Sequence, residues 1–225
     1  ITTQLIDAET DEHRWAEIYD KTLTDIFEVQ TEISNEIVEA LSLNISFDEQ
    51  KRLTTTPTEN FEAYQHYLEG KRAAEERNAA SIAESIVLFQ QAIDLDPNYA
   101  EAYAEIANSI ILQTYYAQAD PKVNAEKANS FLEQAERINP NLSRVYTVKG
   151  LMYNITRKSE EAKEAFEKAI DLSPNDVNAR NQYATYYYYI NDYENQLEQA
   201  EMAYRLDPLS FPIAISYFTA LNYNN

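Results

Sequence analysis

The sequence predicts a mainly α protein: a right-handed superhelix of repeated helix pairs, preceded by a small partial α/β element. The main observation is a sequence motif that occurs four times. Each copy ends near a proline, at Pro97, Pro140, Pro174 or Pro208, and the first copy reads Ala-Ile-Asp-Leu-Asp-Pro-Asn at 92–98. The last three prolines recur at an even spacing of about 34 residues, and the interval before them is longer. A fixed period of this size is typical of a solenoid, in which each repeat buries its apolar face against its neighbours.

The amino-terminal segment, residues 1–46, differs from the rest and is predicted to be the partial α/β element. Residues 1–7 are rich in β-branched side chains, and residues 13–20 alternate in polarity after a turn-like stretch. Two short strands joined by a turn are therefore expected. Because an isolated hairpin is only marginally stable in water, it needs a packing partner.

A helix that follows the hairpin can supply this partner. Apolar residues recur at spacings of three and four through residues 26–41, and Thr24 or Asp25 can cap the helix. The next stretch, residues 47–60, loses this periodicity and is predicted to be a linker, with one helical turn at 48–52.

From residue 61 onward the chain is expected to consist of helix pairs, because apolar and small residues follow helical spacing throughout. An insertion at 115–124, which contains Pro121, explains the longer interval. The last helix has no partner helix, so it either caps the stack or precedes further chain. The predicted solenoid, residues 61–225, divides into 61–97, 100–140, 143–174, 177–208 and a terminal helix at 211–225.

The third unit carries a family resemblance. Its apolar and small residues have the spacing of a tetratricopeptide repeat, and nearly every signature position is filled: Tyr146, Gly150, Tyr153, Ala162, Phe166, Ala169 and Pro174. The resemblance implies a stack of helix-turn-helix units that binds other proteins.

The fourth unit departs from this pattern at three positions. Arg180 replaces the usual aromatic residue, Gln196 replaces a small residue, and Ala200 replaces another aromatic residue. We expect the packing there to be looser, or to depend on neighbouring tyrosines.

A second resemblance covers the start of the chain. Residues 2–10, 13–20 and 25–33 are similar to a bacterial module that itself resembles the amino-terminal domain of TolB. This module precedes tetratricopeptide arrays in some adenylate/guanylate cyclase-like and winged-helix regulatory proteins, and residues 56–70 resemble the start of those arrays. The resemblance implies that the chain is the carboxy-terminal, regulatory part of a bacterial signalling protein, with any catalytic or DNA-binding part upstream of Ile1.

The charge of the chain limits its partners. The formal net charge is −20, which repels phosphate backbones, so we expect no nucleic acid to bind this segment. Such a field favours a basic protein or peptide partner, although solvated helix faces are the simpler explanation of the charge.

The composition also argues against an enzyme. There is no cysteine, and there are two histidines and two glycines, so neither a zinc site nor a glycine-rich phosphate loop is expected. We predict no catalytic residue, no metal and no cofactor. No apolar run approaches the ~20 residues that span a bilayer. A cytoplasmic location is favoured, or a periplasmic one if a transmembrane segment precedes the chain.

The predicted binding surface is the concave groove formed by the first helices of the third and fourth units. Rigid aromatic and amide side chains there suit peptide binding, although they can also line a groove that has no specific ligand. The lysine, asparagine and arginine set that clamps a terminal carboxylate is not present. The candidate residues are Arg144, Thr147, Leu151, Asn154, Asn178, Asn181, Thr185, Tyr188 and Tyr189.

The predicted function is therefore a non-enzymatic protein–protein interaction or scaffold module that binds a partner in this groove. One alternative is self-association into a homodimer through the apolar face of the terminal helix, with Phe211, Ile215, Phe218 and Leu221. Another alternative is a regulatory region of an upstream adenylate cyclase-like enzyme.

Overall fold

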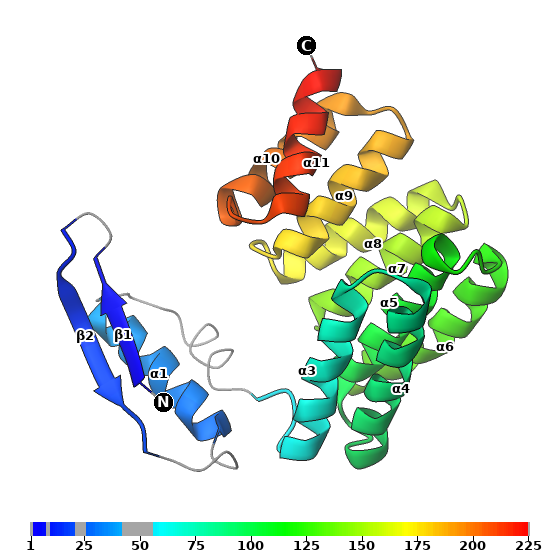
Figure 1. Ribbon diagram of the computed structural model, residues 1–225. Coiled ribbons are helices and arrows are strands. Elements are labelled where there is room, and N and C mark those ends of the chain that lie inside the picture. Colours follow the sequence, from blue (N-terminus) through cyan, green and yellow to red (C-terminus); the bar gives the residue numbers. More distant parts are fainter. Residues whose placement is uncertain (1, 8–9, 21–25, 42–55, 225) are drawn as a thin grey trace. The chain divides into compact units, whose positions relative to one another are not determined.

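The computed structural model describes residues 2–7, 10–20, 26–41 and 56–224. The chain divides into two compact units, Ile1–Phe61 and Glu62–Asn225, which are drawn in Figure 1. The predicted cap at Thr24 or Asp25 and the predicted helical turn at 48–52 lie outside the described residues.

The first unit contains the predicted hairpin and helix. Strands β1 (Thr2–Ile6) and β2 (His13–Ile18) pair in antiparallel fashion, with Leu5 opposite Trp15. Helix α1 (Ile26–Ala40) follows. Tyr19, just after β2, is buried, and its hydroxyl donates a hydrogen bond of 2.9 Å to the Glu36 carboxylate on α1. This bond ties the hairpin to the helix.

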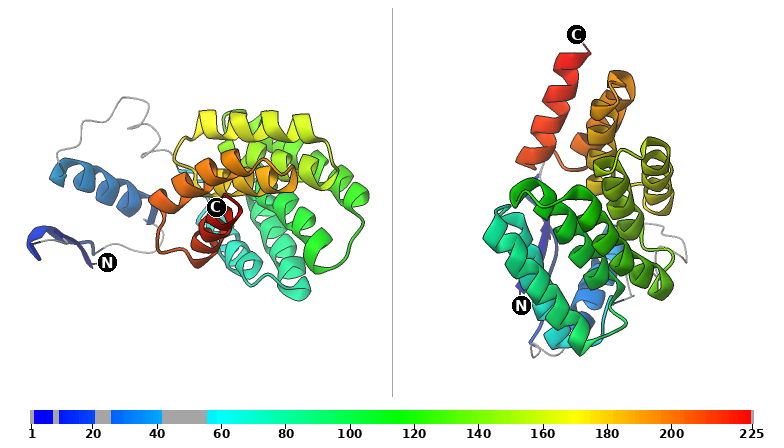
Figure 2. Two further views of the ribbon diagram at one scale, coloured as in Figure 1. Left: turned by 90° about the horizontal axis from the view of Figure 1, so that it is seen from above. Right: turned by 90° about the vertical axis from the view of Figure 1, so that its right-hand side faces the viewer.

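The second unit is a stack of helix pairs (Figure 2), which confirms the predicted fold class. We call the first helix of each pair the inner helix and the second the outer helix. The inner helices are α3 (Phe61–Glu75), α5 (Ala100–Tyr116), α7 (Ser143–Ile155), α9 (Val177–Tyr189) and the unpaired α11 (Phe211–Tyr223). The outer helices are α4 (Ala79–Leu95), α6 (Pro121–Ile138), α8 (Ser159–Leu172) and α10 (Tyr193–Leu206).

Each outer helix ends within the repeated proline-containing motif. The residue before each proline is in an extended or near-extended conformation, as proline requires of its predecessor, and its N–H donates to an alanine carbonyl one turn earlier. This last helical bond recurs in all four outer helices, from Asp96 to Ala92, Asn139 to Ala135, Ser173 to Ala169 and Asp207 to Ala203, at 2.8–3.0 Å. Proline has no N–H to continue the ladder, so the chain turns into the next inner helix.

The turns within the helix pairs use a left-handed residue that is not glycine. Arg77, Gln118, Arg157 and Asn191 have φ values of 51°, 52°, 59° and 60°. In the last two turns the next N–H closes a Schellman motif, from Lys158 to the Tyr153 carbonyl and from Asp192 to the Tyr187 carbonyl.

The two glycines instead lie where an inner helix approaches its outer helix. A Cβ on Gly70 would lie 2.7 Å from Cε1 of Phe89, and a Cβ on Gly150 would lie 2.6 Å from Cε1 of Phe166. Both phenylalanines are fully buried. Glycine is therefore required at these positions by close packing of the helices.

The hydrophobic core of the second unit has two parts. The main cluster extends from Ala63 on α3 to Tyr187 on α9. A separate small cluster holds Ala184, Ala200 and Ala220 and joins α9, α10 and α11.

Candidate functional site

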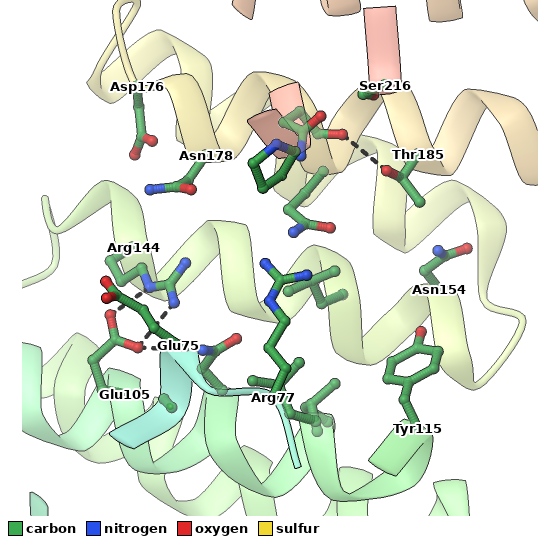
Figure 3. A pocket seen from close by; sticks show the side chains of 18 of the residues that line it. Glu75, Arg77, Glu105, Tyr115, Arg144, Asn154, Asp176, Asn178, Thr185 and Ser216 are labelled. Atoms are coloured by element: carbon green, nitrogen blue, oxygen red, sulfur yellow. Dashed lines mark hydrogen bonds and ion pairs between the residues drawn. The ribbon is translucent and has the colours of Figure 1, made fainter. Parts of the chain in front are cut away.

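A cavity of about 940 Å³ runs along the inner helices of the second unit. Side chains from α3, α5, α7, α9 and α11 line it, and Figure 3 shows several of them pointing into it. Among the described residues, Gln196 on α10 is the one outer-helix residue in this lining. We call this cavity the groove.

The structure brings eight of the nine predicted site residues into the groove lining: Arg144, Leu151, Asn154, Asn178, Asn181, Thr185, Tyr188 and Tyr189. Thr147 is the exception, and its prediction as a groove residue is wrong. It is fully buried, and its Oγ1 donates a bond of 3.3 Å to the Ser143 carbonyl. Helical spacing puts it on the same face as Leu151, but α7 is packed between α5 and α9, and Thr147 is buried in that packing.

Arg144 is not free to bind a ligand. Its Nε and Nη2 donate to the two carboxylate oxygens of Glu105 on α5, at 2.8 and 2.9 Å (Figure 3). Asn108 Nδ2 also donates to Glu105, at 3.3 Å. Burial alone would lower the pKa of Arg144, but the charge and hydrogen bonds of Glu105 outweigh it and raise that pKa. This bidentate pair links two inner helices across the groove floor.

The groove is much closer to neutral than the chain as a whole. Its lining holds three cationic side chains and four carboxylates, against a net charge of −20 for the chain. Arg144 and Glu105 neutralise each other, and Asp176 accepts bonds from the Ala179 N–H and the Ser143 hydroxyl at the start of α9. Burial raises the pKa of Glu101.

Most charged side chains of the lining come from the first part of the stack, although Asp176 immediately precedes α9. Lys71, Glu75, Arg77 and Glu101 come from α3, the turn after it and α5. The side chains that α9, α10 and α11 contribute are all uncharged: Asn178, Asn181, Gln182, Thr185, Tyr188, Tyr189, Gln196, Phe211, Pro212, Ile215, Ser216 and Thr219. The two ends of the groove therefore suit different parts of a ligand.

The tyrosines of α9 divide between groove and core. Tyr189 is 58% exposed, and Tyr188 places its hydroxyl 3.3 Å from the Tyr223 hydroxyl on α11. Tyr183 and Tyr187 are buried, and their hydroxyls are joined by a 2.7 Å hydrogen bond.

The prediction from sequence missed the half of the groove that α3 and α5 provide. Tyr67, Arg77, Glu105 and Tyr115 line it, and burial raises the pKa of Tyr115 to about 12. The less regular spacing of the first two repeats hid these residues. Gln196 was also missed as a groove residue, and its signal was the replacement of a small residue in the repeat pattern.

Two further properties hold for the part of the chain that the structure describes. It contains no group of three or more His, Asp or Glu side chains that could hold a metal ion. No helix within it is both long enough and apolar enough to cross a bilayer.

Known proteins resemble this chain in sequence and in fold. Residues 143–176 match the family model described as tetratricopeptide repeat. A curated relative from Rhizobium meliloti (strain 1021), named "Putative adenylate cyclase 3", is 35% identical over 107 residues, which are 48% of this chain and 18% of the relative. The match thus spans less than a fifth of that protein.

The fold is also found among solved structures. A thermophilic tetratricopeptide-repeat protein of Thermus thermophilus superposes with a TM-score of 0.62 at 19% identity, covering 89% of this chain and all of that one. The MamA protein gives a TM-score of 0.45 at 14% identity, covering 72% of this chain and 82% of its own. The first of these similarities shows a shared fold.

Proposed function

Because the chain carries a tetratricopeptide repeat and folds as a stack of such helix pairs, we propose that it binds a peptide segment of a partner protein in the groove. Stacked repeats of this kind generally serve protein–protein interaction rather than catalysis. The module is non-enzymatic in this proposal, and the groove is its working surface.

One observation carries the proposal: the groove is continuous across all five inner helices. A cavity of about 940 Å³ has room for several residues of an extended peptide. Its lining combines exposed aromatic surface at Tyr189 with amides such as Asn154 and Asn178. Aromatic side chains supply contact area at low entropic cost, and amides can pair with a peptide backbone.

We further propose that the chain is a regulatory part of a longer bacterial signalling protein. The relative named as a putative adenylate cyclase supports this, since it shares 35% identity with this chain over 107 residues. In such a protein, partner binding in the groove would control the activity of a domain elsewhere in the chain.

Peptide binding to the full chain tests the main proposal. Twelve-residue peptides are selected from a random library, and their affinities are measured by fluorescence polarisation. We expect Tyr189→Ala and Asn178→Ala each to weaken binding by about 2- to 10-fold, because each removes an aromatic contact or a hydrogen bond. The matched control is Glu164→Ala on the exposed face of outer helix α8. Equal affinity for the groove variants and the control would contradict the proposal.

A second candidate function is self-association through α11. Alone among the helices that the structure describes, α11 carries no charged residue, so a second copy can approach there without the repulsion expected from a net charge of −20. Phe211 and Phe218 are 76% and 54% exposed, and Leu209 is also exposed. Light scattering should then detect a dimer that Phe218→Glu converts to monomer. A monomer at high concentration would exclude this function.

A further inference from the structure

Two amide residues that line the groove each have a buried side-chain oxygen without a hydrogen-bond partner. Gln196 is only 3% exposed, and its Oε1 is buried and unpaired. Asn181 Oδ1 on α9 is in the same state. Both residues line the groove. Buried polar atoms in folded proteins are almost always paired, because an unpaired one has lost its bonds to water without replacing them.

The position of Gln196 in the repeat explains how it reaches the groove. The same position in the two preceding outer helices, each one repeat earlier, holds Ala128 and Ala162. Both alanines are fully buried and neither lines the groove. At Gln196 a longer side chain extends from α10 into the lining. The amide is therefore an addition to the repeat, and the packing of the helix pairs elsewhere does not require it.

A second glutamine on α10, Gln199, is hydrogen-bonded within the protein and gives a comparison for Gln196. Gln199 Oε1 accepts a hydrogen bond of 2.9 Å from Arg180 Nη1, and that guanidinium is itself largely buried. Gln199 lies outside the groove lining. The two glutamines thus differ in partner and in place, although they lie within one turn of the same helix.

The surroundings of the two amides define the ligand. The side chains that α9, α10 and α11 contribute to the groove carry no charge. The adjacent carboxylate in the lining, Asp176 just before α9, already accepts bonds from the Ala179 N–H and the Ser143 hydroxyl, so a buried cation would find no free carboxylate there. A neutral donor avoids this cost. Phe211 and Ile215 on α11 line the same end of the groove and expose apolar surface, which suits an apolar side chain next to the donor.

We propose that Gln196 and Asn181 form a hydrogen-bond-accepting subsite for the main-chain N–H groups of an extended peptide, with an apolar ligand side chain packed against Phe211 and Ile215. This inference rests on the proposed function, because it names the ligand chemistry at one end of the groove. A main chain supplies neutral N–H donors whatever its sequence, so the subsite binds backbone while the apolar contact selects the side chain.

The first test needs no ligand. Gln196→Leu removes the unpaired oxygen and keeps a similar volume, so the melting temperature of the full chain should rise by about 2–4 °C. Gln199→Leu is the matched control and should lower the melting temperature, because it takes an acceptor from buried Arg180. A melting temperature that is unchanged or lower in Gln196→Leu would overturn the proposal, since the amide would then be satisfied within the protein.

The second test uses the selected twelve-residue peptides, with each main-chain N–H removed in turn by N-methylation. At one position we expect N-methylation to weaken binding to the wild-type chain at least about fivefold and to Gln196→Leu less than twofold. Coupling to a lysine or arginine side chain of the peptide instead would overturn the assignment to neutral N–H donors.

The two proposals fail in different ways. If the peptides lose affinity with Tyr189→Ala and Asn178→Ala but no N-methyl position couples to Gln196, the subsite is wrong and groove binding stands. If no peptide responds to the groove variants, groove binding itself is wrong and the subsite falls with it.

Discussion

The third and fourth helix pairs have the same backbone and different interiors. Inner helices α7 and α9 are both 13 residues long, outer helices α8 and α10 are both 14 residues long, and the pairs are offset by one repeat. The family model matches 143–176, which contains the third pair. The comparison shows which side chains the repeat needs for its shape and which it can exchange.

One exchanged position keeps its hydrogen bond. Tyr146 of the third pair donates from its hydroxyl to the Pro140 carbonyl at 2.9 Å. Arg180, at the equivalent position one repeat later, donates from Nε to the Pro174 carbonyl at 2.7 Å. Both bonds hold an inner helix to the proline turn that precedes it. The repeat therefore requires a donor of sufficient length at this position and not an aromatic ring.

A second exchange changes how the interior is filled. The third pair packs Gly150 against Phe166, while the fourth has Ala184 and Ala200 at the equivalent positions. Tyr183 of the fourth pair stacks on Phe166, with the ring centroids 5.4 Å apart, and the Tyr186 ring lies tilted to Phe166 with the centroids 6.0 Å apart. The fourth pair packs through its tyrosines, which is one of the two alternatives that the sequence left open. The third pair is filled by the Gly150–Phe166 contact, and the fourth contributes the amides Asn178, Asn181 and Gln196 to the groove lining.

Phe166→Ala should produce the largest effect, because it removes an aromatic ring on which both pairs depend. We expect a loss of about 3–5 kcal/mol in the free energy of unfolding, measured with denaturant. Ala200→Gly, at the equivalent place in the fourth pair, is the control and should cost about 1 kcal/mol. Similar costs at the two positions would mean that the pairs are packed alike.

Gly150→Ala should come next in size. Its Cβ would lie 2.6 Å from the buried Phe166 ring, and we expect overpacking to cost about 1–3 kcal/mol, despite the better helix propensity of alanine. Adding Phe166→Leu should recover part of the loss in thermal unfolding. The reverse change in the fourth pair, Ala184→Gly, has no ring to relieve and should also destabilise, by about 1 kcal/mol. Stabilisation by Gly150→Ala would show that the ring can move aside.

The tyrosines of the fourth pair predict a loss of stability at alkaline pH. Burial raises the pKa of Tyr183, and its hydrogen bond with Tyr187 and the nearby Glu167 raise it further. In the unfolded chain the Tyr183 hydroxyl has a pKa near 10.0. In the folded state this hydroxyl therefore keeps its proton at pH values where the unfolded chain has already released it. The stabilisation is complete below pH 10 and is lost as the pH rises through the folded pKa. Denaturant unfolding from pH 8 to 12 should show this loss, and Tyr183→Phe should reduce it.

The smallest effect should come from the turns inside the two pairs. Arg157 and Asn191 occupy the same left-handed position, which asparagine tolerates better than arginine. Arg157→Gly should stabilise the chain by about 0.5–1 kcal/mol, and Asn191→Gly should change it by a few tenths at most. Equal gains at both sites, measured by thermal unfolding, would remove this difference between the pairs.

Sequence alone could predict the helix pairs because proline ends each outer helix by a local rule that needs no knowledge of neighbours. It could place Asn178 and Tyr189 in the groove for a similar reason, since helical spacing sets which face they share. It could not predict that Arg144 pairs with Glu105, because the partner lies 39 residues away on α5 and the spacing of that repeat is less regular. Thr147 shares the right face but is buried in the packing of adjacent helices, which spacing cannot show.

Gln196 was recognised in the sequence as a departure from the repeat, but its place in the groove was not predicted. The departure from a small residue was visible in the sequence and was interpreted as loose packing. The place of Gln196 in the groove lining depends on how α10 packs against its neighbours, which the spacing within one helix cannot show. A basic partner was likewise inferred from the net charge of −20, yet the side chains that α9, α10 and α11 contribute to the lining are uncharged, so basicity of the partner stays a prediction.

The division of the hydrophobic core bears on how tightly any ligand can be held. The main cluster ends at Tyr187, and α11 is joined to the rest through the small cluster of Ala184, Ala200 and Ala220. Local unfolding of this end therefore leaves the main cluster intact. A ligand that contacts α11 binds only those molecules in which α11 is packed against α9 and α10. Its apparent dissociation constant rises as the fraction of such molecules falls. Substitutions in three buried alanines, none of which touches the ligand, would then tune its affinity.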